Sequence, residues 1–151
     1  MNLSDIQSPF QLQGCILQKI IVENDFVFIP NNDMLNMSVN LKNNISDIRK
    51  NEKENCLEAN LVLEVDCIAS ISDNGTKYSI HLALNGLFSF SGDNQDEFTS
   101  MLLLNGNSTL YSIARSQIIT ISSMSLTSGQ LILPLINFVK LFEASKQENK
   151  K

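Results

Sequence analysis

Residues 57–67, Leu-Glu-Ala-Asn-Leu-Val-Leu-Glu-Val-Asp-Cys, alternate apolar and polar side chains more clearly than any other stretch of this chain. Successive side chains of a β-strand point to opposite sides. The apolar set from Leu57 to Cys67 therefore lies on one face, and the polar set with Glu64 and Asp66 on the other. Burial on one side only is typical of an antiparallel sheet. This stretch predicts a sheet with one packed face and one face in solvent.

Further strands are predicted on both sides of this stretch. Residues 73–76, Asp-Asn-Gly-Thr, contain the Asn-Gly pair of a tight hairpin turn, and residues 78–90 then form the partner strand. Residues 11–29 are rich in β-branched and aromatic side chains, and residues 37–43 alternate with period two. The charged segment 44–55 is predicted to be a solvated loop or a short surface helix. Four strands with short or medium connections predict one antiparallel sheet.

The periodicity changes to that of helices after Gly92. A short helix around Phe98 is expected to end at residues 105–107, Asn-Gly-Asn. A main helix is expected over residues 108–124, where apolar residues recur at helical spacing, and a last helix from about Asn137. Strands first and helices last predict an α+β fold, a four-stranded antiparallel sheet with helices packed on one face.

The length of 151 residues fits one domain, which we expect to span residues 1–151, with flexible ends at 1–9 and 145–151. The 11 basic and 16 acidic residues give a net charge of −5, which argues against a nucleic-acid partner. Residues 1–13 lack the pattern of a secretory signal, and the longest apolar runs fall far short of a membrane span. We expect a cytoplasmic protein without membrane insertion.

Few residues are suited to catalysis or metal binding. Cys15, Cys56 and Cys67 show no C-x-x-C spacing and are expected to stay reduced. His81 is the one histidine, and no G-x-x-x-x-G-K-[ST] loop for a nucleotide phosphate occurs. An acid-base scheme could combine Tyr78 and Tyr111 with Glu64 and Asp66, but no spacing favours it over a solvated strand face. We expect neither an enzyme nor a cofactor nor a metal site.

Four segments carry a family resemblance. They are Gly86-Leu87-Phe88-Ser89-Phe90, residues 110–115, residues 131–138 followed by Leu141-Phe142, and the opening strand from Phe10 through Asp25 and Phe28 to Pro30. With these segments in register, the chain resembles the SecB family of protein-export chaperones. The resemblance implies an ATP-independent holdase for unfolded polypeptides. It would serve protein export or a dedicated client such as an antitoxin, and would assemble as a homotetramer, a dimer of dimers.

The resemblance also implies where clients bind. The family's client groove is bordered by the crossover after the first strand and by the last helix with its lead-in. Met34 is the strongest single candidate, because flexible methionine suits surfaces that accept many partners. Apolar residues at helical spacing form core more often than they line a groove. The candidate groove residues are Phe28, Met34, Leu35, Leu131, Leu133, Leu135, Phe138, Leu141 and Phe142.

Two further surfaces follow from the resemblance. Subunit contacts are expected at Ile80, Leu82, Leu84, Ile118 and Ile121. The family's acidic sheet face, which docks the export motor SecA, corresponds here to Asp25, Glu64, Asp66 and His81. His81 stands where the family has an acid, and we expect it to be exposed. A solvated sheet surface would carry the same acidic residues.

A function of another class also fits the sequence. The cleft between sheet and helices could serve as a small-molecule or peptide-binding module for one defined ligand. Such a ligand would raise the melting temperature with its concentration, whereas a promiscuous holdase would show little such shift.

Overall fold

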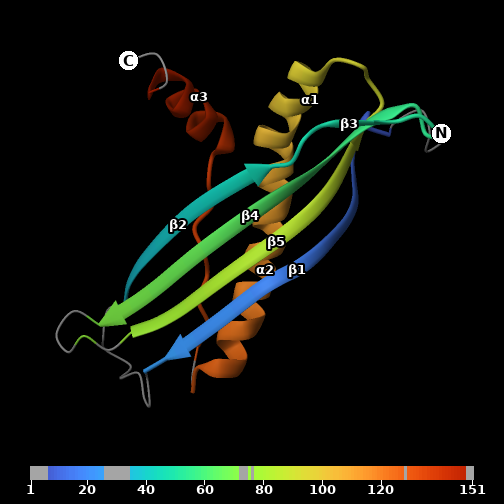
Figure 1. Ribbon diagram of the computed structural model, residues 1–151. Helices are drawn as coiled ribbons and strands as arrows, with labels where there is room; N and C mark the ends of the chain where they lie inside the picture. Colours follow the sequence, from blue (N-terminus) through green and yellow to red (C-terminus); the bar gives the residue numbers. More distant parts are fainter. Residues whose placement is uncertain (1–6, 26–34, 72–74, 76, 128, 149–151) are drawn as a thin grey trace.

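The computed structural model describes residues 7–25, 35–71, 75, 77–127 and 129–148. Within them, one antiparallel sheet is covered on a single face by helices (Figure 1), which confirms the predicted α+β fold. The strands are β1 (Phe10–Asn24), β2 (Leu35–Ile45), β3 (Arg49–Asn51), β4 (Cys56–Ile71) and β5 (Lys77–Phe90).

The strand order is β1-β5-β4-β2, so β1 and β2 lie at the two edges, and β3 pairs with β4. The alternation predicted for β4 is confirmed, because its residues from Leu57 to Ala69 are alternately buried and half-buried or exposed. The β4–β5 hairpin contains Gly75 with a φ of 69°, which suits the predicted turn. Residues 72–74 and 76 lie outside the described part.

The prediction for segment 44–55 was wrong at its centre. β2 continues to Ile45, and Arg49–Asn51 form the short strand β3 beside β4. The Asn51 Nδ2 atom donates to Glu58 Oε1 at 2.7 Å, and Arg49 Nε lies 3.7 Å from Glu58 Oε2. Two residues of this strand, Arg49 and Asn51, therefore interact with one carboxylate on the neighbouring strand. The sheet has five strands within the described residues, one more than predicted.

The helices are α1 (Gln95–Met101), the π-helical turn η2 (Leu102–Gly106), α2 (Asn107–Ser125) and α3 (Phe138–Glu148). The Asn94 side chain accepts hydrogen bonds from the backbone of Asp96 and Glu97 and so begins α1. Residues 95–125 are one continuous helical segment that crosses behind the sheet (Figure 1).

The predicted helix end at Asn-Gly-Asn was wrong. Gly106 has helical φ and ψ of −61° and −52°, and a Cβ atom built there would lie 2.9 Å from Leu61 Cδ2 of β4. This glycine is therefore accounted for by the close approach of helix and sheet, and it does not end a helix.

The core lies between the sheet and the helical segment 95–125. At one end, the ring of Phe10 stacks on Phe88 with centroids 5.0 Å apart, and Phe98 stacks on Phe90 at 5.7 Å. Toward the other end, the buried face of β5 contacts α2. This core holds the helices in place and leaves α3 beyond the edge of the sheet (Figure 1).

Candidate functional site

The site begins with the extended lead-in to α3, residues 131–137, which is bound to α2 by side-chain hydrogen bonds. The Leu131 N–H donates to Ser122 Oγ at 2.8 Å. The Arg115 Nε atom donates to the carbonyl of Leu133 at 2.9 Å, and the Tyr111 hydroxyl donates to the carbonyl of Pro134 at 2.8 Å. Three side chains of one helix therefore fix the path of the lead-in.

The lead-in delivers α3 to a defined position. The Asn137 side chain accepts a hydrogen bond from the Lys140 N–H at 3.1 Å and caps the helix, as the predicted start near this residue implies. The Phe138 ring meets Tyr111 edge to face, with centroids 5.6 Å apart. The first turn of α3 is thus anchored on α2.

Two pockets lie beside α3 and share Phe138 as a wall. One has a volume of about 530 Å³ and the other about 310 Å³, sizes that admit one or two large side chains. We call the surface formed by these two pockets the α3 groove. The larger pocket is lined by Leu104, Asn105, Ser108, Leu135, Ile136, Asn137, Phe138 and Val139, and the smaller by Asn43, Leu103, Asn107, Phe138, Leu141, Phe142 and Ala144.

Part of the predicted groove lies in the α3 groove. Leu135 is 83% exposed, Leu141 is 49% exposed and Phe142 is half-buried, and all three line a pocket. Phe138 also lines both pockets, although its side chain is mostly buried. These four residues lie together around α3, and their role in client binding stays a prediction.

Two predicted groove residues are core residues. Leu131 and Leu133 are buried, because their side chains point toward α2 and the sheet while Ile132 and Pro134 point outward. Their prediction as exposed groove residues was wrong. Phe28 and Met34 lie outside the described residues, and for Leu35 only the backbone, at the start of β2, is described.

The predicted subunit contacts were also wrong for most residues. Ile80, Leu82 and Leu84 of β5 and Ile118 of α2 are buried within this single chain, so their side chains have no surface left for a neighbour. Ile121 packs against the core and stays half-buried.

The outer sheet face carries the residues predicted to dock SecA. His81 and Asp66 face each other across β5 and β4, and His81 Nδ1 lies 2.5 Å from Asp66 Oδ1. His81 is half-buried, so the prediction of an exposed histidine was wrong. Glu64 is placed opposite Lys42 of β2, and Asp25 lies just beyond the end of β1. The acidic side chains of the two central strands therefore have basic or imidazole neighbours.

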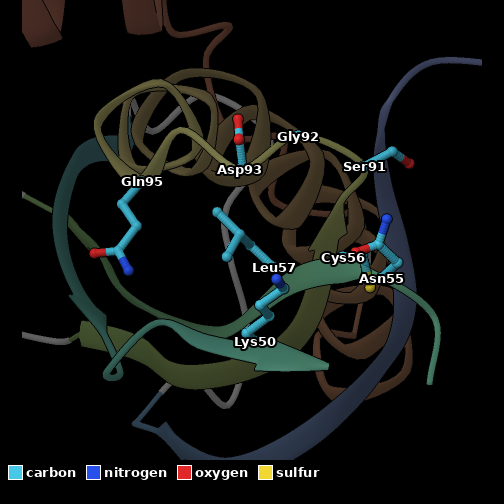
Figure 2. Close-up of a pocket in the computed structure, with 8 residues that line it drawn as sticks. All are labelled: Lys50, Asn55, Cys56, Leu57, Ser91, Gly92, Asp93 and Gln95. Atoms are coloured by element: carbon cyan, nitrogen blue, oxygen red, sulfur yellow. The ribbon is translucent and has the colours of Figure 1, made fainter. Parts of the chain in front are cut away.

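A third pocket, of about 480 Å³, lies at the far end of the sheet (Figure 2). Its walls come from β3, the start of β4 and the β5–α1 connection. Figure 2 shows the polar ends of Ser91, Asp93 and Gln95 pointing in different directions. Without converging polar groups, this pocket lacks the usual mark of a binding site.

Burial raises the pKa of three titratable groups in the core. Desolvation raises the pKa of the Cys67 thiol to about 11, and burial also raises the pKa of the Tyr78 and Tyr111 hydroxyls. No group of three or more potential metal ligands occurs among the described residues. None of the helices in the described part of the chain has the length and apolarity needed to cross a bilayer.

Comparison with known families decides what kind of protein carries this groove. The family model described as preprotein translocase subunit SecB matches residues 10–149. The chain belongs to the SecB family. The match runs from β1 to the end of α3 and so includes every wall of the α3 groove of this SecB-family protein.

Solved structures with the same fold include a SecB-like chaperone. It is Rv1957 of Mycobacterium tuberculosis in complex with a ChAD peptide from the Rv1956 HigA1 antitoxin; its TM-score is 0.65 at 11% identity, covering 84% of this chain and 90% of that one. A protein of unknown function from Streptococcus agalactiae aligns with a TM-score of 0.49 at 11% identity, over 83% of this chain and 97% of that one. A search of curated protein sequences gave no match.

Sequence reasoning missed several residues of this SecB-family site. Val139 is exposed beside Leu135, and Leu103, Leu104 and Asn107 contribute walls from the helical segment 95–125. Leu103 and Leu104 belong to an apolar run that reads as core. Nothing in the sequence indicates that Asn107 belongs to the site, because its position beside α3 depends on the path of the lead-in.

Proposed function

We propose that this chain is an ATP-independent chaperone that holds non-native polypeptides in the α3 groove. One observation carries the proposal: Leu135, Val139 and Leu141 expose apolar surface around α3, beside two pockets, in a chain of the SecB family. Exposed apolar side chains around a groove are typical of protein-interaction sites. The protein performs no chemistry on its clients, and no cofactor takes part.

The affinity of one groove follows from the exposed area. Burying each of these three side chains from its present exposure contributes about 1–2 kcal/mol, or about 3–6 kcal/mol together, before the cost of association. A single groove is therefore a weak site. Several grooves in one assembly would bind one long client with a higher apparent affinity, because each further contact is intramolecular.

The edge strand β1 supports such an assembly. One side of this strand has no neighbouring strand in the described residues, so the outward backbone N–H and C=O groups of residues 11–23 lack a strand partner there. It also exposes large apolar side chains on both faces, namely Ile16, Leu17, Ile20, Ile21 and Val22. A second copy pairing along β1 would continue the sheet, and two such dimers would give the homotetramer that the family resemblance implies.

The assembly is tested by analytical ultracentrifugation of the wild type and of an Ile20→Lys variant. We expect about four subunits for the wild type and a smaller species for the variant, since lysine disfavours pairing at a strand edge. An unchanged assembly in Ile20→Lys would count against β1 as the interface.

The choice of client follows from the outer sheet face. Asp66 pairs with His81, and the strand register places Glu64 opposite Lys42, so each of these two acidic residues lies beside a histidine or a lysine. This favours a dedicated cytoplasmic client such as an antitoxin over SecA-dependent export. The similar Rv1957, whose structure holds an antitoxin peptide, supports the same choice. Toxin and antitoxin genes beside the gene for this chain would agree with a dedicated client. Micromolar binding of purified SecA would contradict a dedicated client.

The chaperone proposal itself is tested without nucleotide. A chemically unfolded, slow-folding protein is diluted into the chain, and aggregation is followed by light scattering. We expect suppression at near-stoichiometric ratios. Continued aggregation at a several-fold excess of the chain would contradict a general holdase, and the remaining candidates would be a single-client chaperone and the small-molecule or peptide-binding module.

A further inference from the structure

The smaller pocket of the α3 groove contains a polar group that the proposed apolar contacts do not use. Asn107, the first residue of α2, is 2% exposed and lines this pocket. Its Nδ2 atom donates to the carbonyl of Leu103 at 3.0 Å. Its Oδ1 atom is buried and has no hydrogen-bond partner among the described residues.

The hydrogen bond to Leu103 fixes the orientation of the side-chain amide. A carbonyl can only accept, so the NH₂ group must face Leu103 and the oxygen must face the other way. Asn107 directly follows the π-helical turn η2, and its backbone N–H bonds to the carbonyls of Leu102 and Leu104 in that turn. Such π-helical turns occur often at functional sites.

A buried amide oxygen without a donor is unfavourable, and native proteins rarely keep one without a reason. The other residues that line this pocket are apolar, apart from Asn43 on β2. The pocket of about 310 Å³ therefore offers apolar contacts, and one of its lining residues holds an unused, buried acceptor.

We propose that Asn107 Oδ1 accepts a hydrogen bond from a main-chain N–H of the bound polypeptide. This inference rests on the proposed function and adds a polar contact to it. The main-chain N–H is the donor that clients of any sequence share, and a segment entering an apolar groove must find an acceptor for it. Because Oδ1 is not in contact with solvent, entry of the client shifts a neighbouring pocket side chain.

The test replaces the amide by an apolar group of similar size and uses two probes. The first probe is reduced, carboxymethylated α-lactalbumin, a permanently unfolded polypeptide. The second is Nile red, an apolar dye without a hydrogen-bond donor. For Asn107→Leu we expect a Kd for the polypeptide about 3–10-fold above that of the wild type, the range of one neutral hydrogen bond. We expect the Kd for Nile red to be unchanged or lower.

The matched control is Asn60→Leu on the outer face of β4, which should change neither Kd. Equal weakening of both probes by Asn107→Leu would mean damage to the pocket and would overturn the inference. An unchanged Kd for the polypeptide in Asn107→Leu would also overturn the inference. Either of these two results would leave the proposed chaperone function intact. If the wild type fails to bind the polypeptide, the proposed function falls and this inference falls with it.

Discussion

The hydrogen bond between the lead-in and α2 makes a quantitative prediction for Ser122. This residue is fully buried, and its Oγ atom accepts from the Leu131 N–H at 2.8 Å and donates to the Ile119 carbonyl at 3.1 Å. A Ser122→Ala substitution leaves the Leu131 N–H buried without a partner, which costs about 1–3 kcal/mol. The better helix propensity of alanine returns about 0.5 kcal/mol. We expect a net loss of about 0.5–2.5 kcal/mol in the free energy of unfolding.

The assay is equilibrium unfolding in urea, with the melting temperature as a second measure. For a chain of this length the expected loss lowers the melting temperature by about 1–10 °C. Hydrogen exchange of the amides in residues 131–137 should also become faster, because the lead-in loses an attachment.

The neighbouring Ser123 provides a matched control. Its hydroxyl is exposed and donates only to the carbonyl of Thr120 at 2.7 Å, within its own helix. Ser123→Ala should leave stability unchanged or raise it slightly. If Ser122→Ala and Ser123→Ala have the same effect on the unfolding midpoint, the lead-in is not held as described.

Three further predictions concern the core and the groove. Leu133→Ala should cost about 2–5 kcal/mol in urea unfolding and Leu135→Ala less than about 0.5 kcal/mol, since the first side chain is buried and the second exposed; equal costs would refute their placement. Burial raises the pKa of the Cys67 thiol from 9.0 to about 11, so the unfolded state loses this proton first as the pH rises. Stability should therefore fall by about 2–3 kcal/mol between these pH values, and Cys67→Ala should lack this part of the alkaline loss; an identical pH profile would be the negative result. Gly106→Ala should lower the melting temperature despite the helix propensity of alanine, because its Cβ would meet Leu61 at 2.9 Å, and a higher melting temperature would disprove the close approach.

The sheet could be predicted from the sequence because alternating apolar and polar residues indicate a strand that is buried on one face. The residues from Leu57 to Cys67 show one period-two pattern, and the structure buries the apolar set. The end of the first long helix could not be predicted in the same way. Asn-Gly-Asn is typical of a helix end, and only the packing of Gly106 on β4 shows why the helix continues.

The candidate site was predicted in outline. The lead-in and the last helix were placed correctly, but the sequence could not separate groove from core among their leucines. One signal was present, because Leu131 and Leu133 alternate with Ile132 and Pro134 as in an extended segment with one buried side. The predicted subunit contacts, such as Leu82, failed for a related reason: an apolar pattern shows that a residue is buried but not which neighbour buries it.

The central claim is that exposed apolar side chains of the α3 groove hold non-native polypeptide. It is tested most directly by two matched substitutions, one in the α3 groove and one on the outer face of the sheet. Leu141→Gln changes a groove residue that is 49% exposed, and Ile68→Gln changes a residue of the outer face of β4 that is 42% exposed. Both are compared with the wild type in the nucleotide-free aggregation assay. The account predicts that Leu141→Gln weakens suppression several-fold while Ile68→Gln retains it; equal suppression by the two variants, or a loss confined to Ile68→Gln, would contradict it.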